Sequence, residues 1–304
     1  MRASEPGAKT HTVEGGRVWR YGLRSFALGY LALILIIPVG LIFFKAFEDG
    51  VMHALESVTT PDALHAFYLT IVLVLIAVPL NTIFGIACAI VLVRHRFHGK
   101  AILNALIDLP FAVSPIVIGL SLVLVYGSVD GWFGPWLADH GIQVIFSPPG
   151  MALATIFVSL PFVVREVQPV LQEIGDEQEQ AATTLGASGW QTFWRITLPS
   201  IRWGVTYGVV LGTARALGEF GAVAVVSGKI SGSTETATLF VEKQYEHFDV
   251  AGAYAAALVL AVLALMTLFA MNLVQRRDRK IVAPSVVAEP ALQTAGQTTG
   301  KEAP

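Results

Sequence analysis

The chain has 304 residues, of which 54% are hydrophobic and 14% are charged, with a formal net charge of -2 and a mean hydropathy of +0.65. Soluble domains carry about a quarter charged residues, so this composition predicts an all-α integral membrane protein. The charge balance gives no support to nucleic-acid binding. The only cysteine, Cys88, lies in an apolar segment and excludes an intramolecular disulfide.

Six apolar segments are long enough to cross a bilayer, which takes about 20 residues of helix. They are residues 25–47, 67–93, 101–126, 151–170, 201–226 and 251–275. The first run is too long for a signal-peptide core, so we expect a retained span. The predicted organisation is a basic segment 1–24, a six-span domain 25–275 with a polar loop at 171–200, and a tail 276–304 that begins basic and continues as disordered chain.

The lysine and arginine residues predict the orientation. Fourteen of the twenty lie before residue 25, in 94–100, at Arg195 or after residue 275, whereas the opposite side carries only Lys229 and Lys243. Because loops rich in Lys and Arg stay in the cytoplasm, both termini and the 171–200 loop are predicted to be cytoplasmic.

The third predicted span contains helix-breaking residues near its middle. Pro110, Ser114, Pro115 and Gly119 fall within one short stretch. One interpretation is a broken helix whose backbone groups meet a solute, which makes Ser114 and Pro115 candidate pathway residues. The other interpretation is a simple proline kink for helix packing.

The fifth predicted span combines small residues with charge. A stripe that favours close helix packing recurs every four residues, at Gly204, Gly208, Gly212 and Ala216. Arg215 and Glu219 are also four apart and share a helix face. They are either a gate that attracts anions or a self-neutralised pair that locks helices together. For Arg165, near the end of the fourth span, snorkelling to the membrane surface is the simpler explanation.

The polar segment 176–199 lies between the fourth and fifth spans. Its pattern predicts two short helices joined at Gly186, which can take a left-handed conformation, with Ser188 capping the second helix and Pro199 ending it. Three aromatic residues between 190 and 194 need a surface on which to pack. Such a hairpin suits docking into a groove of a water-soluble partner.

Motifs for independent chemistry are absent from the sequence. There is no G-x-x-x-x-G-K-[ST] phosphate loop, no H-E-x-x-H and no G-x-S-x-G. We therefore expect that this chain is not an enzyme, holds no cofactor or metal, and does not hydrolyse ATP by itself.

The hairpin carries a resemblance to a known motif. The tripeptide Gln180-Ala181-Ala182, then Gly186, then Ile196, Leu198 and Pro199 after nine intervening residues, resembles the EAA loop of the membrane subunits of bacterial ATP-binding-cassette (ABC) importers. The usual glutamate is replaced by Gln180, with Glu179 beside it. The resemblance implies that the ATPase-coupling residues are Glu179, Gln180, Ala181, Ala182, Gly186, Ile196, Leu198 and Pro199.

A longer stretch narrows the resemblance. Residues 186–228, together with the segments LPFAVSPIVIGL and LPFVVREVQPVL, are similar to W-type permease subunits of sulfate/thiosulfate importers, and the likeness covers residues 20–275. It implies the MetI-like fold of type I ABC importer permeases, with a coupling-helix hairpin, in the bacterial inner membrane. The implied partners are two copies of an ATPase subunit, a T-type second permease in a heterodimer, and a periplasmic sulfate/thiosulfate-binding protein.

Other functions stay open on the sequence alone. One alternative is that this chain is a permease subunit of an importer for molybdate, tungstate or another oxyanion. A different class is an independent secondary transporter or channel, although Glu219 is the only carboxylate deep in a predicted span.

Overall fold

The computed structural model describes residues 17–282, with side chains described for residues 21–269. All regular elements in this part of the chain are helices, which confirms the all-α prediction. They are α1 (Arg17–Ala46), α2 (Val51–Thr59), α3 (Pro61–Arg94), α4 (Lys100–Ala112), α5 (Pro115–Tyr126), α6 (Gly134–Asp139), α7 (Pro148–Ile174), α8 (Glu177–Thr184), α9 (Gly189–Thr192), the π-helical turn η1 (Phe193–Thr197), α10 (Leu198–Leu217), α11 (Gly221–Val226), α12 (Ala237–Glu246) and α13 (Val250–Val282). Residues 1–16 of the predicted basic segment and residues 283–304 of the predicted tail lie outside the described residues.

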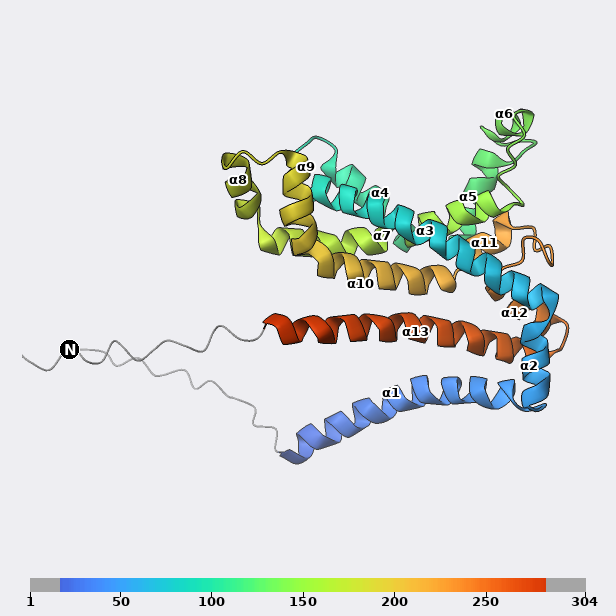
Figure 1. The fold of residues 1–304 in the computed structure, drawn as a ribbon. Helices are drawn as coiled ribbons and strands as arrows, with labels where there is room; N and C mark the ends of the chain where they lie inside the picture. The colour runs from blue at the N-terminus through green and yellow to red at the C-terminus, as the bar shows by residue number, and fades with distance from the viewer. Residues whose placement is uncertain (1–16, 283–304) are drawn as a thin grey trace, which may run out of the picture.

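The long helices lie along a common axis (Figure 1). Within the described chain, α1, α3, α7 and α13 are each long and apolar enough to cross a membrane, and α4 with α5 meets the same test as a bent pair. The start of α1 and the end of α13 lie at the same end of the bundle as α8 (Figure 1). The chain is thus built as a multi-pass membrane protein with four such spans, or five with the bent pair, in its described part. Helices occupy all six predicted segments, but α10 and α11 in the fifth segment do not meet the test for a span.

The third predicted span is broken rather than kinked. Helix α4 ends at Ala112, α5 begins at Pro115, and the two axes meet at 115°. Val113 and Ser114 between them are extended, with ψ angles of 137° and 136°. The ring of Pro115 disfavours the helical conformation of the residue before it, Ser114, and Pro115 itself starts the next helix. The simple-kink interpretation of this stretch is therefore wrong, because the helix is broken here; that its backbone groups meet a solute stays a prediction.

The fifth predicted span, 201–226, is also divided. Helix α10 ends at Leu217, and α11 begins at Gly221. Helix α10 packs on α7 at close range, because a Cβ added to Gly204 would lie 2.7 Å from the carbonyl oxygen of Glu166 and one added to Gly208 would lie 2.7 Å from Cα of Val163. Small residues in α10 therefore let the backbones of the two helices approach each other.

The buried core lies between α3, α7 and α10 and extends to α5 and α11. Toward the hairpin end it contains Leu92, Val167 and Ile201, each no more than 1% exposed. A second cluster, around Met151 and Val223, fills the opposite end.

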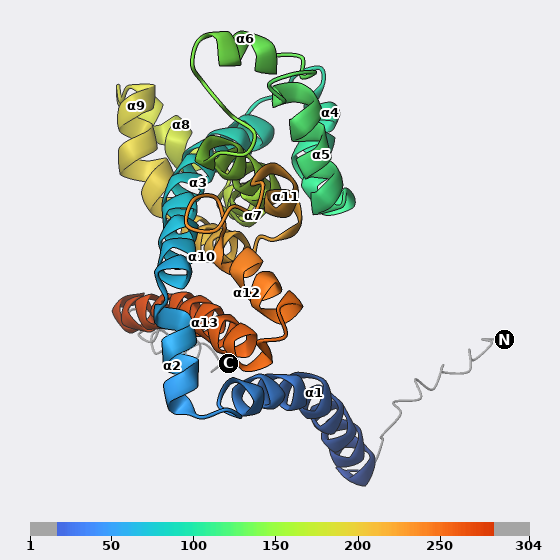
Figure 2. The ribbon, with the colours of Figure 1, turned by 90° about the vertical axis from the view of Figure 1, so that its right-hand side faces the viewer.

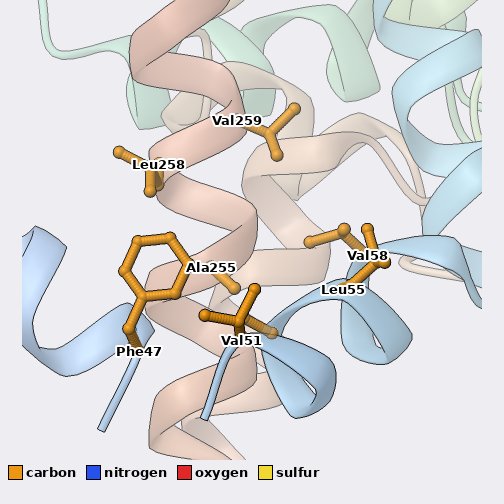
Figure 3. A pocket seen from close by; sticks show the side chains of 8 residues that line it. Phe47, Val51, Leu55, Val58, Ala255, Leu258 and Val259 are labelled. Carbon is orange, nitrogen blue, oxygen red and sulfur yellow. The ribbon is translucent and has the colours of Figure 1, made fainter.

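Helix α1 lies apart from this core, beside α13 (Figure 2). Its apolar side chains are almost all exposed, as expected for a helix surrounded by lipid. Where the chain turns from α1 into α2, apolar side chains such as Phe47, Val51 and Leu258 surround a cavity of about 210 Å³ against α13 (Figure 3). Helix α1 is therefore attached to the bundle through α13, and the neighbouring contact between α2 and α13 is incompletely packed.

The α10–α7 contact gives a test of this packing. We expect Gly208→Ala to lower the temperature of thermal unfolding in detergent, because overpacking against the α7 backbone costs about 1–3 kcal/mol. Gly212→Ala is the matched control, since a Cβ there would have no atom within 4 Å and alanine favours the helix by about 1 kcal/mol. Equal unfolding temperatures for the two variants would show that α10 is not held tightly against α7.

Candidate functional site

The polar segment between α7 and α10 forms the predicted hairpin. Gly186 has a φ of 87°, and its N–H donates to the carbonyl oxygen of Thr183 at 3.0 Å, which closes α8. Ser188 then begins α9 with a capping box, because its Oγ accepts from the backbone N–H of Gln191 at 3.3 Å and the Gln191 side chain accepts from the N–H of Ser188 at 3.0 Å. The left-handed glycine and the N-cap are both confirmed.

The predicted end of the second hairpin helix at Pro199 is wrong. Helix α9 continues into the π-helical turn η1, where the N–H of Leu198 donates to the carbonyl oxygen of Phe193, and then directly into α10. Pro199 lies in the first turn of α10, where proline is well tolerated. The wider turn admits one extra residue without interrupting the helical backbone, so α9, η1 and α10 follow one another directly, with a sharp bend where α10 begins (Figure 1).

A second connection joins the hairpin to the bundle through Arg94, the last residue of α3. Its guanidinium binds both carboxylate oxygens of Glu179 in α8, at 2.8 Å and 3.3 Å. The same group donates to the carbonyl oxygens of Leu171 at 3.0 Å and Gly175 at 2.6 Å. The hydroxyl of Thr197 donates to Glu179 at 2.7 Å. We call these five residues the Arg94 network; it joins α3, α7, α8 and η1.

The outward face of the hairpin is apolar and exposed. Leu185 is 89% exposed, Trp190 70% and Trp194 51%. The two tryptophans and Phe193 form a cluster with ring centroids 5.5–6.0 Å apart. Of the residues that the EAA-loop resemblance singles out, Gln180, Ala181, Gly186 and Pro199 are exposed, while Glu179, Ala182, Ile196 and Leu198 are partly buried.

The two helix breaks lie next to each other, and Ser114, Gly218 and Phe220 at these breaks are exposed in the isolated chain. A Cβ added to Gly221, at the start of α11, would lie 2.9 Å from Cβ of Pro115. One turn further along α5, a Cβ added to Gly119 would lie 2.8 Å from the carbonyl oxygen of Ala222. The irregular backbone at 113–114 and that at 218–220 therefore share one region, which holds the candidate pathway residues Ser114 and Pro115.

Arg215 and Glu219 form the ion pair that their spacing predicts. Arg215 Nη1 lies 2.7 Å from Glu219 Oε2, and the Glu219 side chain is 2% exposed against 30% for Arg215. Glu219 Oε1 also accepts from the N–H of Ala222 at 2.9 Å, and its carbonyl oxygen accepts from the hydroxyl of Thr238 at 2.8 Å. Glu219 thus stabilises the start of α11, whereas Arg215 keeps a partly accessible guanidinium.

Sequence reasoning missed the ion pairs of Arg94 and Arg165. It assigned Arg94 to a basic loop, although an arginine at the end of a span and an acidic residue at the start of a polar loop were both visible. It assigned Arg165 to snorkelling, but Arg165 Nε donates to Asp108 Oδ1 of α4 at 2.7 Å and fixes α4 to α7. Both partners are distant in the sequence, so no local pattern indicates either pair.

The fold and the hairpin define a permease subunit of a transport system. Residues 81–280 match the family described as the binding-protein-dependent transport system inner membrane component, and the chain belongs to that family. It is 53% identical to the sulfate transport system permease protein CysW of Synechocystis over 85% of this chain and 93% of the relative. It is 50% identical to CysW of Escherichia coli K12, over 81% of this chain and 84% of that relative, and 39% identical to CysT of the same strain, over 84% and 92%.

A solved structure has the same fold. A chain of a bacterial ABC transporter involved in the import of the acidic polysaccharide alginate superimposes with a TM-score of 0.72 at 18% identity, covering 86% of this chain and 99% of that one. The predicted fold class, a type I ABC importer permease, is confirmed by this likeness together with the family match.

The buried carboxylate of Glu219 provides a test of its structural role. We expect Glu219→Ala to lower the unfolding temperature and the amount of protein in the membrane, because it leaves Arg215 without its partner and the N–H of Ala222 without its acceptor, a loss of about 3 kcal/mol or more. Glu219→Gln keeps an acceptor for that N–H and should lose less. Gel filtration after heating measures the unfolding temperature, and an immunoblot of the membrane fraction measures the abundance. Wild-type values for both variants would exclude the structural role.

Proposed function

We propose that this chain is a membrane-spanning permease subunit of an ATP-driven sulfate/thiosulfate importer in the bacterial inner membrane, with both termini and the 176–199 hairpin in the cytoplasm. The observation that carries the proposal is the hairpin itself. It is fixed to the bundle on its inner side and exposes apolar and aromatic side chains on its outer side, in a chain 50–53% identical to CysW proteins.

The geometry supports coupling to a separate ATPase. A groove on the ATPase would receive α8, where Gln180 and Ala181 are exposed and small side chains leave a slim helix. When ATP binding closes the ATPase pair, it would displace the hairpin. Because η1 continues without a break into α10, the displacement would reach the transport helices and favour one of two bundle states.

The comparisons support the kinds of partner. The 39% identity to CysT favours a second permease of T type in a heterodimeric core. The alginate transporter is also known in complex with a substrate-bound periplasmic protein, and a periplasmic protein that binds sulfate or thiosulfate would have the same place here. Two ATPase copies would serve the two hairpins of such a core.

For the transport pathway we propose the region where the two helix breaks meet. Arg215 supports this because it is a partly accessible cation at the end of α10, and a cation attracts an anionic solute. The extended backbone at Val113 and Ser114, directly before Pro115, interrupts the helix at this place, as in the broken helices that form binding sites in transporters.

The function is tested by uptake into vesicles that contain this chain, a T-type permease, the ATPase and the binding protein. We expect sulfate uptake that requires ATP and is competed by thiosulfate but not by molybdate. Competition by molybdate alone would assign the importer to the molybdate/tungstate class. Uptake by this chain alone at the rate of the full assembly would instead identify an independent transporter.

The coupling surface is tested separately with Ala181→Trp. A bulky ring on the exposed face of α8 should prevent the helix from entering its groove, so we expect loss of ATPase copurification at normal abundance in the membrane. Ala138→Trp, on the exposed surface of α6 at the other end of the bundle, makes the same change away from the hairpin and should copurify normally. Normal copurification of Ala181→Trp would exclude α8 as the docking helix.

A further inference from the structure

We propose that Arg94 and Glu179 are positioning residues of the transport cycle, which hold the hairpin at a fixed angle to α3 and α7 so that force on its outer face reaches both helices. This inference rests on the proposed function. It assigns Glu179 to the inner side of the hairpin, as the link to the membrane helices, and leaves the docking contact to the exposed residues beside it.

The first support is that α8 has few other attachments. None of its residues is buried, and its strongest contacts are with α9 and η1, inside the same hairpin. Among the described residues, the side-chain hydrogen bonds and ion pairs between α8 and other elements all involve Glu179. Without Glu179, α8 would be tied to the bundle mainly through the flanking chain.

The second support is how Arg94 is used. Its guanidinium binds Glu179 and also two carbonyl oxygens at the end of α7, those of Leu171 and Gly175. The last carbonyls of a helix lack partners within it, and a cation there is favourable. A single planar group with several donors thus fixes the end of α7 and the start of the hairpin together, which the single ammonium of a lysine would not reproduce.

The third support is burial. The Arg94 side chain is 14% exposed and that of Glu179 is 21% exposed, whereas the next residue, Gln180, is exposed. An ion pair shielded from water holds its geometry better than one on the surface, and loss of one partner leaves the other charge uncompensated. The acidic side chain next to the docking face is therefore turned inward, and Thr197 fixes its orientation from η1.

The test uses the full complex with Glu179→Gln, which is nearly isosteric but uncharged. We expect normal membrane abundance, normal ATPase copurification and continued ATP hydrolysis, but about a tenfold lower number of sulfate ions transported per ATP, a typical size for the coupling between two sites. Arg94→Lys should reduce the same ratio. The control Glu246→Gln makes the same chemical change at an exposed position at the end of α12 and should leave it unchanged.

A second measurement reports on position directly. Spin labels at Thr183 in α8 and His98 after α3 should give a narrow distance distribution in the otherwise wild-type complex and a broad one with Glu179→Gln. A narrow distribution together with a wild-type transport ratio in Glu179→Gln would overturn the proposal. So would loss of ATPase copurification with an undisturbed distance, because Glu179 would then be a docking contact.

Failure of the proposed function gives a different result. It appears in the wild-type complex as absence of ATP-dependent sulfate uptake, before any variant is compared. In that case the distance distributions decide alone whether Arg94 and Glu179 position the hairpin, and an unchanged distribution in Glu179→Gln overturns the inference.

Discussion

Every backbone N–H and C=O within a bilayer needs a partner from the protein, because lipid supplies none. Irregular backbone is therefore tolerated at membrane depth only where other segments cover it. In the described part of the chain, the third and fifth predicted spans have irregular backbone at residues 113–114 and 218–220, and the adjoining helices α5 and α11 pack together. Ser114, Gly218 and Phe220 are nevertheless exposed in the isolated chain. The buried Glu219 side chain supplies one of the partners that the backbone needs here, since it accepts from the N–H of Ala222 at the start of α11.

The hairpin presents the converse problem, because a polar segment must be held firmly by an apolar bundle. One link is the helical continuation through η1 into α10. The other is ionic, from Arg94 to Glu179. The helices at the ends of these links are themselves in close contact, since Gly85 lets α3 approach α7 and Gly204 and Gly208 let α10 do so. A displacement of the hairpin would thus reach three mutually packed helices rather than one.

The sequence predicted what depends on local composition. Apolar runs located the long helices, although their ends differ from the prediction by up to about eight residues, as at the start of α1. Gly186 and Ser188 located the hairpin turn, because these signals act within one or two helical turns. Pro115 marked the break in the third span but not its angle of 115°, which depends on how α5 packs on α11. The Arg94–Glu179 pair spans 85 residues and depends on where two helix ends meet. Pro199 was wrongly predicted to end the second hairpin helix. The π turn before it contains one residue more than an α-helical turn, and the usual rules for helix ends do not allow for that residue.

The pairing of Arg215 bears on how an anion would pass the proposed pathway. A free arginine in a dry bundle would hold a divalent anion strongly, and a pathway needs binding weak enough for release. With Glu219 only 2.7 Å away, the net charge at this point is near zero, and a passing anion would compete with a carboxylate already in place. Glu219 is held by the α11 backbone, so it would stay while the anion leaves. The ion pair that stabilises the helix break would therefore also prevent the site from binding the anion too tightly for release. High affinity for the solute would then be a property of the periplasmic partner.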